Sequence, residues 1–506
     1  MGKAHSNALK TLPYMVYPPP ARPLLAAIAG RTDSLVREAA ARYGFANPYT
    51  DWRDLVADPS VEAALAGRRL PVIVTCRPAW EGGQFKGSEE ERRRILRDAL
   101  ASDAEYVDIE WRAHFTDLIA QTAGRRVVLS MHDFTGVPDD LTGRAQAMRA
   151  TGAEVIKLAV TTSRLTDCLP LLDLGAQIGR RGTVLIGMGA CGLPTRILAS
   201  QFGSVWTYAG GERQVGQLTP AELDSYRFRS VTEKTQVYGL VGSPIAHSVS
   251  PVMHNASFAA NQIDAVYVPL PAADADDFMT FARAIGLRGA SVTIPFKVSL
   301  FDRMDEVYAV ARRIGAINTI RVLDGKWIGG NTDVSGFLAP LKDRVPLRGT
   351  RAAVLGAGGS ARAVAAALSS SQAEVTVYAR NPFRASEIAA TASCASRPLP
   401  PEPNSWDLLV NCTPVGMHPR VDETPLDASL LTGRYVYDLV YNPTDTRLLR
   451  EAKAAGCQTI GGLDMLVAQA AEQFEWWTGR RPVVGIMREA ALKRLAEFMR
   501  HENYVV

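Results

Sequence analysis

The sequence predicts an α/β chain of more than one domain. We expect a (β/α)8-type barrel, incomplete in its strands, followed by a two-lobed α/β region that ends in a Rossmann domain. Two observations carry this prediction. Short apolar runs alternate with amphipathic stretches from Pro71 to Ala209, and a glycine-rich turn at 356–361 stands between a strand-like and a helix-like stretch. The length of 506 residues suits two or three domains, each with its own core.

Composition excludes several classes of protein. A hydrophobic fraction of 47% and a net charge of 56 − 52 = +4 are typical of a folded chain. So small a net charge, spread along the chain, does not suit a nucleic-acid partner. No apolar run approaches the roughly 20 residues that cross a bilayer. The six cysteines form no Cys-x-x-Cys pair and no cluster with zinc spacing, so no metal is expected and the predicted compartment is the cytoplasm.

The barrel prediction depends on the regular alternation of strand-like and helix-like segments in the first half of the chain. Its strand-like runs are Pro71–Cys76, Tyr106–Ile109, Val127–Met131, Glu154–Ala159, Val184–Gly187 and Val205–Tyr208, and its clearest helix-like segments are Ser88–Ser102 and Asp140–Thr151. Repeats of about 20–35 residues are typical of parallel strands joined by crossover helices. The six units favour a barrel but fall short of eight. Thr219–Gln236 is polar and without an apolar period, which predicts a linker or a last helix.

Two residues on neighbouring strands predict chemistry in the barrel. His132 follows the Val127–Met131 run, and Lys157 lies inside the next apolar run. A lysine in a buried strand loses solvation, which lowers its pKa and favours the nucleophilic amine. The alternatives are a lysine that reaches solvent from an edge strand and an ordinary polar histidine at a strand end. A Schiff-base lysine beside a general base suits proton abstraction next to a carbonyl, as in an aldolase or a dehydratase.

The motifs around these two residues resemble type I 3-dehydroquinate dehydratase. They are TCRPAWEGG (75–83), YVDIE (106–110), MHDF (131–134), EVIKLAV (154–160), GLPTRI (192–197) and FGS (202–204). The resemblance implies Lys157 as the Schiff-base former and His132 as the general acid/base. It also implies Glu81 and Asp108 as supports, with the substrate contacted by Arg77, Phe134, Arg196 and Gln217. The family's Ser-Ala-Pro-Gly-Gln lid reads RQVGQ at 213–217, so its serine contact is lost.

The glycine-rich turn of the second half predicts a dinucleotide site. A strand, a glycine turn and a helix N-terminus together hold a pyrophosphate, here at Gly356, Gly358, Gly359, Ser360 and Ala361. The next strand-like run, Glu374–Tyr378, is followed by Arg380, Asn381 and Arg384, where an acidic residue would select NAD. Guanidinium groups suit a 2′-phosphate, so NADP is the expected cofactor.

Polar side chains between apolar runs form the expected substrate pocket of the same region. Ser248, Ser250, Lys297, Asn318 and Asp333 bring hydroxyl, ammonium, amide and carboxylate groups that suit a polyol, although serine, asparagine and aspartate are also common turn residues. The motifs here resemble shikimate dehydrogenase along residues 237–500. They include GSPIAHSVSPVMHN (242–255), SVTIPFK (291–297), GAINTI (315–320), GNTDVSGF (330–337), NCTPVGM (411–417) and GGLDMLVAQAAEQFEWWTG (461–479).

This second resemblance implies roles for individual residues. Lys297 and Asp333 would be the acid/base pair at the reacting hydroxyl. Shikimate would be contacted by Ser248, Ser250, Thr293, Asn318, Tyr441 and Gln469, and the nicotinamide would be bordered by Thr413 and Gly462.

Residues 1–70 do not continue the barrel pattern. Type I dehydratases carry a Glu-Leu-Arg-Leu-Asp-like strand ahead of the TCRP strand, and we find no such segment here. The two strand candidates are Tyr14–Tyr17 and Leu24–Ala29, of which the second has the character to fill a barrel position. Met1–Leu12 and Leu24–Glu62 instead resemble a fragment of a glucose-fructose-type oxidoreductase that lacks the first strand and most glycines of a dinucleotide site. We therefore expect an impaired dehydratase.

The combined interpretation is a bifunctional enzyme of the shikimate pathway. Its expected parts are residues 1–70, a dehydratase-like barrel at 71–225, a shikimate-binding domain at 237–340 and an NADP-binding domain at 341–506. The partners are 3-dehydroquinate, 3-dehydroshikimate and shikimate, without nucleic acid or membrane. The alternatives are an NAD-dependent quinate/shikimate dehydrogenase and a homologue that binds pathway metabolites without turnover.

Overall fold

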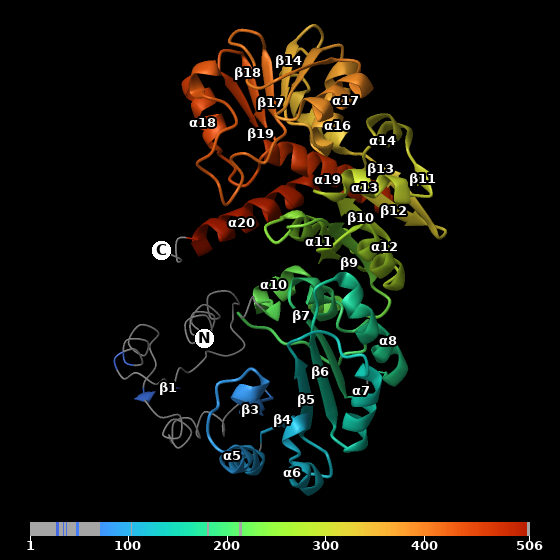
Figure 1. Cartoon of the computed structure of the whole chain (residues 1–506), viewed down its shortest axis with the longest axis vertical. Helices are drawn as coiled ribbons and strands as arrows, with labels where there is room; N and C mark the ends of the chain where they lie inside the picture. Colours follow the sequence, from blue (N-terminus) through green and yellow to red (C-terminus); the bar gives the residue numbers. More distant parts are fainter. Residues whose placement is uncertain are drawn as a thin grey trace. The chain divides into compact units, whose positions relative to one another are not determined.

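The computed structural model describes residues 71–102, 104–179, 182–211 and 215–502, with Ala27–Ala29, Ser34, Arg37 and Asn47–Tyr49 ahead of them. Contacts divide the chain into two compact units, one of residues 1–162 and 170–223 and the other of residues 163–169 and 224–506 (Figure 1). Both are α/β units, as predicted. Among the described residues no helix is both long and apolar enough to cross a membrane.

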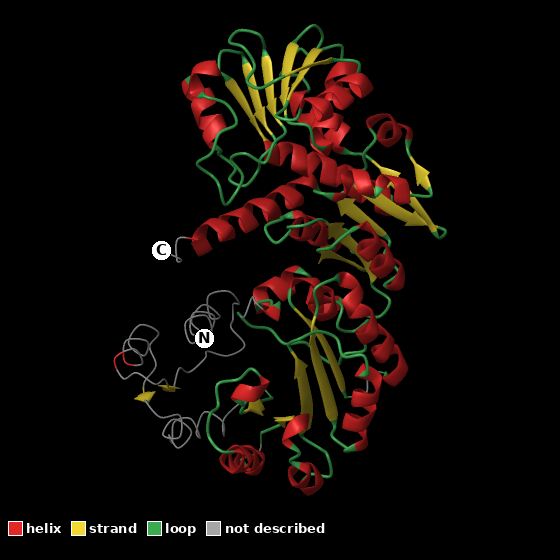
Figure 2. Cartoon of the chain, in the orientation of Figure 1, coloured by secondary structure: helices red, strands yellow, loops and turns green. Residues whose placement is uncertain are grey.

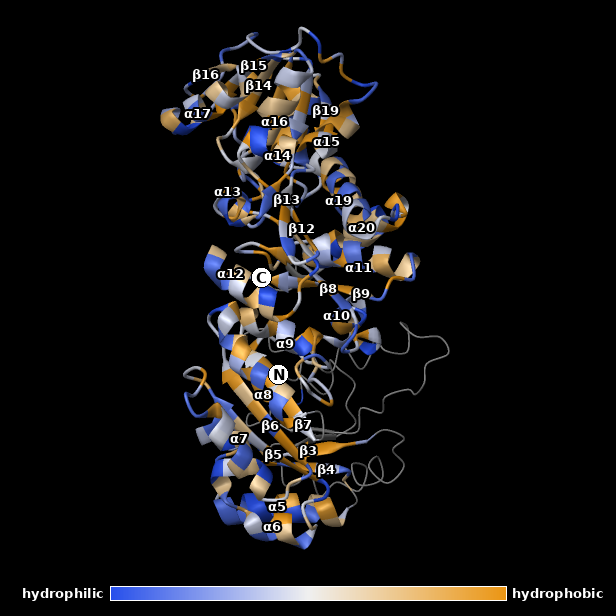
Figure 3. Cartoon of the chain, turned by 90° about the vertical axis from the view of Figure 1, so that its right-hand side faces the viewer, coloured by the Kyte–Doolittle hydropathy of each residue, from blue (hydrophilic) through white to orange (hydrophobic). Residues whose placement is uncertain are grey.

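The first unit contains a parallel sheet in the order β3-β4-β5-β6-β7. Its strands are β3 (Ile73–Thr75), β4 (Tyr106–Glu110), β5 (Val127–Asp133), β6 (Val155–Thr161) and β7 (Thr183–Met188). Its helices are α5 (Glu89–Ala101), α6 (Thr116–Gln121), α7 (Leu141–Ala150), α8 (Leu169–Ile178), α9 (Leu193–Ile197) and α10 (Pro220–Ser225). Strands β5, β6 and β7 are mostly hydrophobic (Figure 3) and buried over most of their residues, as is usual in a parallel sheet, which is covered on both faces.

Within the described residues this sheet has five strands and is not closed into a barrel. The prediction of a strand at Val205–Tyr208 is wrong. That segment has one backbone bond to the sheet, from Val205 N–H to Thr183 O at 2.9 Å, and an isolated bridge follows between Ala209 and Leu218. A strand needs a continuous ladder of such bonds, and none forms here.

The described part of residues 1–70 forms a separate two-stranded sheet. Here β1 (Ala27–Ala29) pairs in parallel with β2 (Asn47–Tyr49), and neither joins the five-stranded sheet. The expectation that Leu24–Ala29 fills a barrel position is therefore wrong for its described residues. The other predictions for this region, including the Tyr14–Tyr17 strand, lie outside the described residues.

The second unit begins with a mixed six-stranded sheet in the order β11-β13-β12-β10-β8-β9. Its strands are β8 (Gln236–Val241), β9 (Ala265–Leu270), β10 (Gly289–Val292), β11 (Glu306–Val307), β12 (Thr319–Leu323) and β13 (Lys326–Gly330). The helices of this lobe are α11 (Ser250–Ala260), α12 (Ala275–Ala284), α13 (Phe296–Ser299), α14 (Ala309–Ile314) and α15 (Asp333–Leu338). We call this part the substrate lobe.

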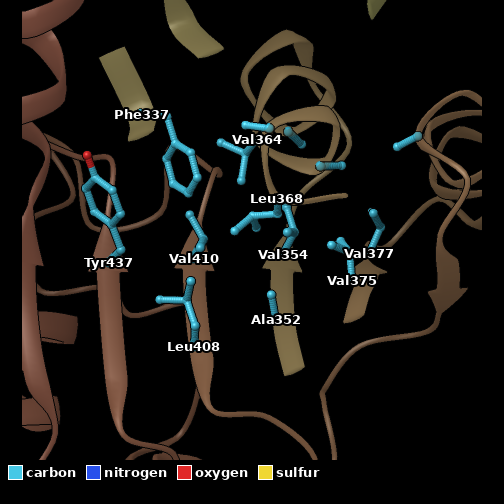
Figure 4. Close-up of a cluster of buried hydrophobic side chains, with 14 of the residues drawn as sticks. Phe337, Ala352, Val354, Val364, Leu368, Val375, Val377, Leu408, Val410 and Tyr437 are labelled. Carbon is cyan, nitrogen blue, oxygen red and sulfur yellow. The ribbon is translucent and has the colours of Figure 1, made fainter. Parts of the chain in front are cut away.

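The other part of the second unit, the cofactor lobe, is a doubly wound parallel sheet in the order β16-β15-β14-β17-β18-β19 (Figure 2). Its strands are β14 (Arg351–Leu355), β15 (Glu374–Tyr378), β16 (Ala395–Arg397), β17 (Leu408–Asn411), β18 (Tyr435–Asp438) and β19 (Gln458–Gly461), with helices α16 (Gly359–Ser370), α17 (Pro382–Ala392) and α18 (Arg447–Ala454). Alternate strand residues such as Val354 and Val410 pack against Val364 and Leu368 of α16 (Figure 4).

Two long helices end the described chain. They are α19 (Gly462–Thr478), which leaves the cofactor lobe at β19, and α20 (Val484–Glu502). Phe474 of α19 and Met487 of α20 are buried in one cluster with Met253 and Phe258 of α11. The C-terminal helices thus return to the substrate lobe and hold the two lobes as one unit.

Candidate active sites

The first candidate site surrounds Lys157 on β6. Its ammonium nitrogen lies 3.3 Å from Asp108 Oδ2 and 4.3 Å from the centre of the Tyr208 ring. Burial lowers the pKa of Lys157, and the nearby Arg77 and Arg196 lower it further, while Asp108 opposes them. The arrangement therefore favours a neutral amine, which is the nucleophilic form.

Asp108 on β4 is held by more than the lysine. Arg77 Nη2 lies 2.9 Å from Asp108 Oδ2, and the Ser130 hydroxyl donates to Asp108 Oδ1. Burial alone would raise the pKa of Asp108, but Lys157, Arg77 and Ser130 outweigh it and lower the pKa to about 2. Asp108 is thus a fixed anion that orients the lysine.

His132, at the end of β5, is paired with Glu81. The His132 backbone N–H donates to Glu81 Oε1 at 2.9 Å, and Nδ1 lies 3.3 Å from the same oxygen. Burial lowers the pKa of His132 to about 4, with Lys157 and Arg77 adding to the effect and Glu81 opposing it. Near neutral pH the ring is therefore uncharged and able to accept a proton.

A buried ion cluster in this site was missing from the sequence prediction. Glu110 lies two residues after Asp108 on β4 and is fully buried between Arg92, which donates to Oε2, and Arg77, whose Nη1 lies 3.0 Å from Oε1. Burial raises the pKa of Glu110 to about 7 although both arginines lower it. The i, i+2 spacing of Asp108 and Glu110 in one strand places both side chains on one face, and this signal was present in the sequence.

The other predicted residues of this site stand in different surroundings. Arg196 is buried, and its Nη2 donates to Val215 O at 2.8 Å, while its Nε has no partner among the described residues. Phe134 is half exposed and lies parallel to the His132 ring at 6.2 Å. Gln217 is half-buried against Gly210. Within the described residues Arg196 has no carboxylate partner, which leaves its charge for an anion.

The second candidate site is centred on Lys297 of α13 and Asp333 at the start of α15. Lys297 Nζ lies 2.5 Å from Asp333 Oδ2, and Asn318 Nδ2 donates to Asp333 Oδ1 at 2.8 Å. The backbone N–H of Asp333 donates to Asn331 Oδ1 at 3.0 Å. Asp333 and Asn318 are both buried, so these bonds fix the carboxylate at the edge of the lobe.

Other predicted substrate contacts surround this pair. Asn318 Nδ2 lies 3.3 Å from Gln469 Oε1 of α19, and Thr332 N–H donates to Asn318 Oδ1 at 2.8 Å. Thr332 was not singled out by the sequence, although it directly precedes Asp333. The backbone N–H of Ser250 donates to Ser248 Oγ at 3.2 Å.

Two further residues predicted to contact the substrate are Tyr441 and Thr293. Burial raises the pKa of Tyr441, which packs against the buried cluster that contains Met253 and Phe258. Thr293 follows β10 and is half-buried, and its backbone N–H donates to Val241 O at 2.9 Å. Thr293 therefore lies at the end of β10, in the segment that leads to Lys297.

The glycine turn lies between β14 and α16. Gly356 has φ +114°, which favours glycine, and a Cβ there would meet Thr413 Cγ2 at 3.1 Å. Gly358 is the N-cap of α16 and no side chain caps it, so the N–H groups of the first turn, including Ser360 and Ala361, have no side-chain cap. A Cβ on Gly358 would meet nothing within 4 Å. These features fit a bound pyrophosphate.

The residues that the cofactor prediction names after β15 have different surroundings. Arg380 and Arg384 are exposed and have no ion pair in the described part of the chain. The Asn381 side chain instead caps α17 by accepting from Arg384 N–H at 3.2 Å. Thr413 donates to Asn411 Oδ1 at 2.7 Å. Gly462 packs so closely that a Cβ would lie 2.3 Å from Leu439 O, so glycine is needed there.

The two units define a class: an α/β enzyme that joins a lyase to an NADP-dependent oxidoreductase. The profile of type I 3-dehydroquinase matches residues 51–232, that of the shikimate dehydrogenase substrate-binding domain matches 240–320, and that of the shikimate 5′-dehydrogenase C-terminal domain matches 462–492. The first match begins at residue 51, ahead of the described sheet.

Individual relatives agree with these profiles. The chain is 34% identical over 463 residues to a chloroplastic bifunctional 3-dehydroquinate dehydratase/shikimate dehydrogenase of Arabidopsis thaliana, covering 85% of this chain and 76% of that protein. It is 45% identical over 278 residues to an NADP+ shikimate dehydrogenase of Symbiobacterium thermophilum, covering 51% of this chain and 95% of the relative. The chain belongs to the family of bifunctional 3-dehydroquinate dehydratase/shikimate dehydrogenases.

A solved structure also resembles the second half. The shikimate 5-dehydrogenase of Thermus thermophilus, crystallised with NADP(H) and shikimate, is 39% identical and matches 51% of this chain and 99% of its own, with a TM-score of 0.47.

Proposed function

We propose that this chain dehydrates 3-dehydroquinate to 3-dehydroshikimate at Lys157 and reduces 3-dehydroshikimate to shikimate with NADPH at Lys297 and Asp333. The observation that carries the proposal is the presence, in each unit, of a lysine paired with a buried aspartate, in the residues that the family resemblance assigns to catalysis. Family membership and the NADP+ relatives support both reactions and the cofactor.

In the reduction, the cofactor supplies hydride to the carbonyl carbon of the substrate. Lys297 then gives a proton to the oxygen that becomes the hydroxyl, and Asp333, 2.5 Å away, holds the lysine in place. Asn318 keeps the carboxylate oriented by its bond to Oδ1. Ser248, Ser250, Thr293, Gln469 and Tyr441 are proposed to hold the other hydroxyls and the carboxylate of the substrate.

The residues of the cofactor lobe fit NADP. The α16 N-terminus is free for the pyrophosphate at Gly356, Gly358, Gly359, Ser360 and Ala361. The guanidinium groups of Arg380 and Arg384 are proposed to hold the 2′-phosphate, and Thr413 and Gly462 to border the nicotinamide. Asn381 contributes by capping α17, which fixes the start of the helix that carries Arg384 and the position of the adjoining Arg380.

In the dehydration, the neutral amine of Lys157 attacks the ketone carbon of the substrate, and loss of water leaves an imine. His132 removes a proton from the neighbouring carbon and returns it to the departing hydroxyl, so the C–O bond breaks as the new double bond forms. Hydrolysis of the imine then frees Lys157. Glu81 orients His132, and Asp108 orients Lys157.

The substrate of this first reaction is a carboxylate, which suits the charge of Arg196. That guanidinium is buried and has no anionic partner among the described residues, so a bidentate bond to the substrate carboxylate would satisfy it. Arg77, Phe134 and Gln217 are proposed as the remaining contacts. Because the upstream strand expected of the family was not found in residues 1–70, we propose that dehydration is the slower of the two reactions. The proposed compartment is the cytoplasm.

The test is an assay of each half-reaction on the purified chain. Shikimate oxidation is followed with NADP+ and with NAD+ by the absorbance of the reduced cofactor. Quinate is supplied as a competing substrate. Dehydration of 3-dehydroquinate is followed by the absorbance of the conjugated product. A preference for NAD+ and quinate would favour the quinate/shikimate dehydrogenase alternative, and no turnover in either assay would favour a metabolite-binding homologue.

A further inference from the structure

The two adjacent glycines of the pyrophosphate turn have different neighbours. A Cβ built on Gly358 meets no atom within 4 Å. A Cβ built on Gly359 lies 2.9 Å from Cδ, 3.1 Å from Cβ and 3.5 Å from Cγ of Lys297. Real Cβ atoms essentially never approach closer than 3.0 Å, so an alanine at 359 forces Lys297 to move.

Lys297 has little freedom to move away. Its ammonium group is joined to Asp333 at 2.5 Å, and its backbone carbonyl accepts from Ile317 N–H at 2.8 Å. The contact with Gly359 involves the Cβ of the lysine as well as its flexible end. A side chain held at both ends and pressed near its middle yields at the end that is not part of the backbone, which is the contact of Nζ with Asp333.

Backbone geometry gives no separate reason for glycine at 359. Its φ is outside the left-handed region, and it is the first residue of α16. In such a position alanine ordinarily stabilises a protein, because it reduces the freedom of the unfolded chain. The crowding by Lys297 is the feature that opposes alanine here.

We propose that Gly359 is a positioning residue for Lys297: its missing side chain leaves the space in which the Lys297 side chain passes the cofactor turn to reach Asp333. This inference rests on the proposed role of Lys297 in reduction. It gives Gly359 a function distinct from that of Gly358, whose open surroundings are the place for the pyrophosphate itself.

The experiment is a double-mutant cycle on the full chain. Gly359→Ala and Gly358→Ala are each made in the parent and in Lys297→Ala, and melting temperature, NADPH affinity and shikimate oxidation are measured. In the parent, Gly359→Ala is expected to lower the melting temperature and to lower kcat about tenfold or more, because a small misplacement of an acid/base group is costly. In Lys297→Ala, the same substitution is expected to leave the melting temperature unchanged or raise it.

The control variant separates this role from binding of the pyrophosphate. Gly358→Ala is expected to weaken NADPH binding equally in both backgrounds, within about twofold, as independent sites do. If Gly359→Ala lowers the melting temperature equally in both backgrounds, or leaves kcat at the parent value, the proposal is overturned. The melting measurement does not depend on catalysis, so a chain without dehydrogenase activity would refute the proposed function and still report on the contact between Gly359 and Lys297.

Discussion

Acid should destabilise the dehydrogenase unit through one histidine. His254 of α11 is fully buried, its ring is stacked on Tyr267 at 4.5 Å, and neither ring nitrogen has a hydrogen-bond partner among the described residues. Burial lowers the pKa of His254 from 6.5 to about 3. Between these values the unfolded chain binds a proton that the folded chain refuses, so stability falls as pH falls through this window.

The size of the effect follows from the shift. A solution at about pH 5 is about 1.5 pH units below the pKa of the unfolded histidine. Each unit corresponds to about 1.36 kcal/mol of folding free energy, so His254 alone accounts for a loss of ~2 kcal/mol. His254→Phe keeps a ring against Tyr267 and Trp477 and removes the titrating group. The variant should therefore lose ~2 kcal/mol less than the parent between about pH 7.5 and pH 5.

The assay is denaturant unfolding of parent and variant at the two pH values, followed by tryptophan fluorescence because Trp477 lies 5.1 Å from the His254 ring. His132, with its pKa of about 4, titrates in both proteins and cancels from the difference. An equal acid loss in parent and variant would mean that the folded unit accommodates a charged His254, and would refute the reasoning.

The remaining predictions concern the proposed catalytic and cofactor residues. Lys297→Ala should lower dehydrogenase kcat by about 10²–10⁴-fold while shikimate still binds, because an acid/base group contributes about that much; near-normal turnover would exclude the assignment. Arg380→Ala and Arg384→Ala should each weaken NADP binding about tenfold or more and leave NAD binding nearly unchanged, and equal losses for both cofactors in a titration would argue against a phosphate contact. Borohydride with 3-dehydroquinate should trap substrate on Lys157, and peptide mapping of Lys157→Met should find no adduct; an adduct on another lysine would contradict the site. Dehydratase kcat should be well below the usual enzyme median of about 10 s⁻¹, and a value near that median would show that the Glu-Leu-Arg-Leu-Asp-like sequence is not needed.

Several elements were predictable because their signals are local. The run Glu374–Tyr378 was predicted with the bounds that β15 has, since an apolar run between turns defines a buried parallel strand. The glycine turn was equally readable, because strand, turn and helix follow one another in sequence. The predicted strand at Val205–Tyr208 was wrong because a strand forms only by hydrogen bonding to a neighbouring strand. This segment has a single backbone hydrogen bond to β7.

The same distinction holds within the first site. Lys157 and His132 stand in recognisable motifs, whereas the partners of Glu110 come from distant parts of the chain. Arg92 lies on α5, and Arg77 lies in the loop after β3, so the cluster appears only when β3, β4 and α5 are assembled. Strand register adds a further relation, because Glu110 is paired with Ser130 and Ser130 with Lys157.

We propose that a lysine paired with an aspartate serves two different reactions in this chain, and the two pairs differ in their surroundings. Lys157 stands 3.3 Å from its carboxylate and near two guanidinium groups, Arg77 and Arg196, whose charges add to burial in favouring the neutral amine. A neutral amine forms a covalent bond to a ketone. Lys297 stands closer to its own carboxylate, at 2.5 Å, at a lobe boundary where its side chain passes the cofactor turn. A lysine held by a carboxylate beside the cofactor turn is fixed in position, which suits an acid/base group in the reduction of a carbonyl to a hydroxyl. The guanidinium groups around Lys157 are therefore as much a part of the dehydratase assignment as the lysine itself.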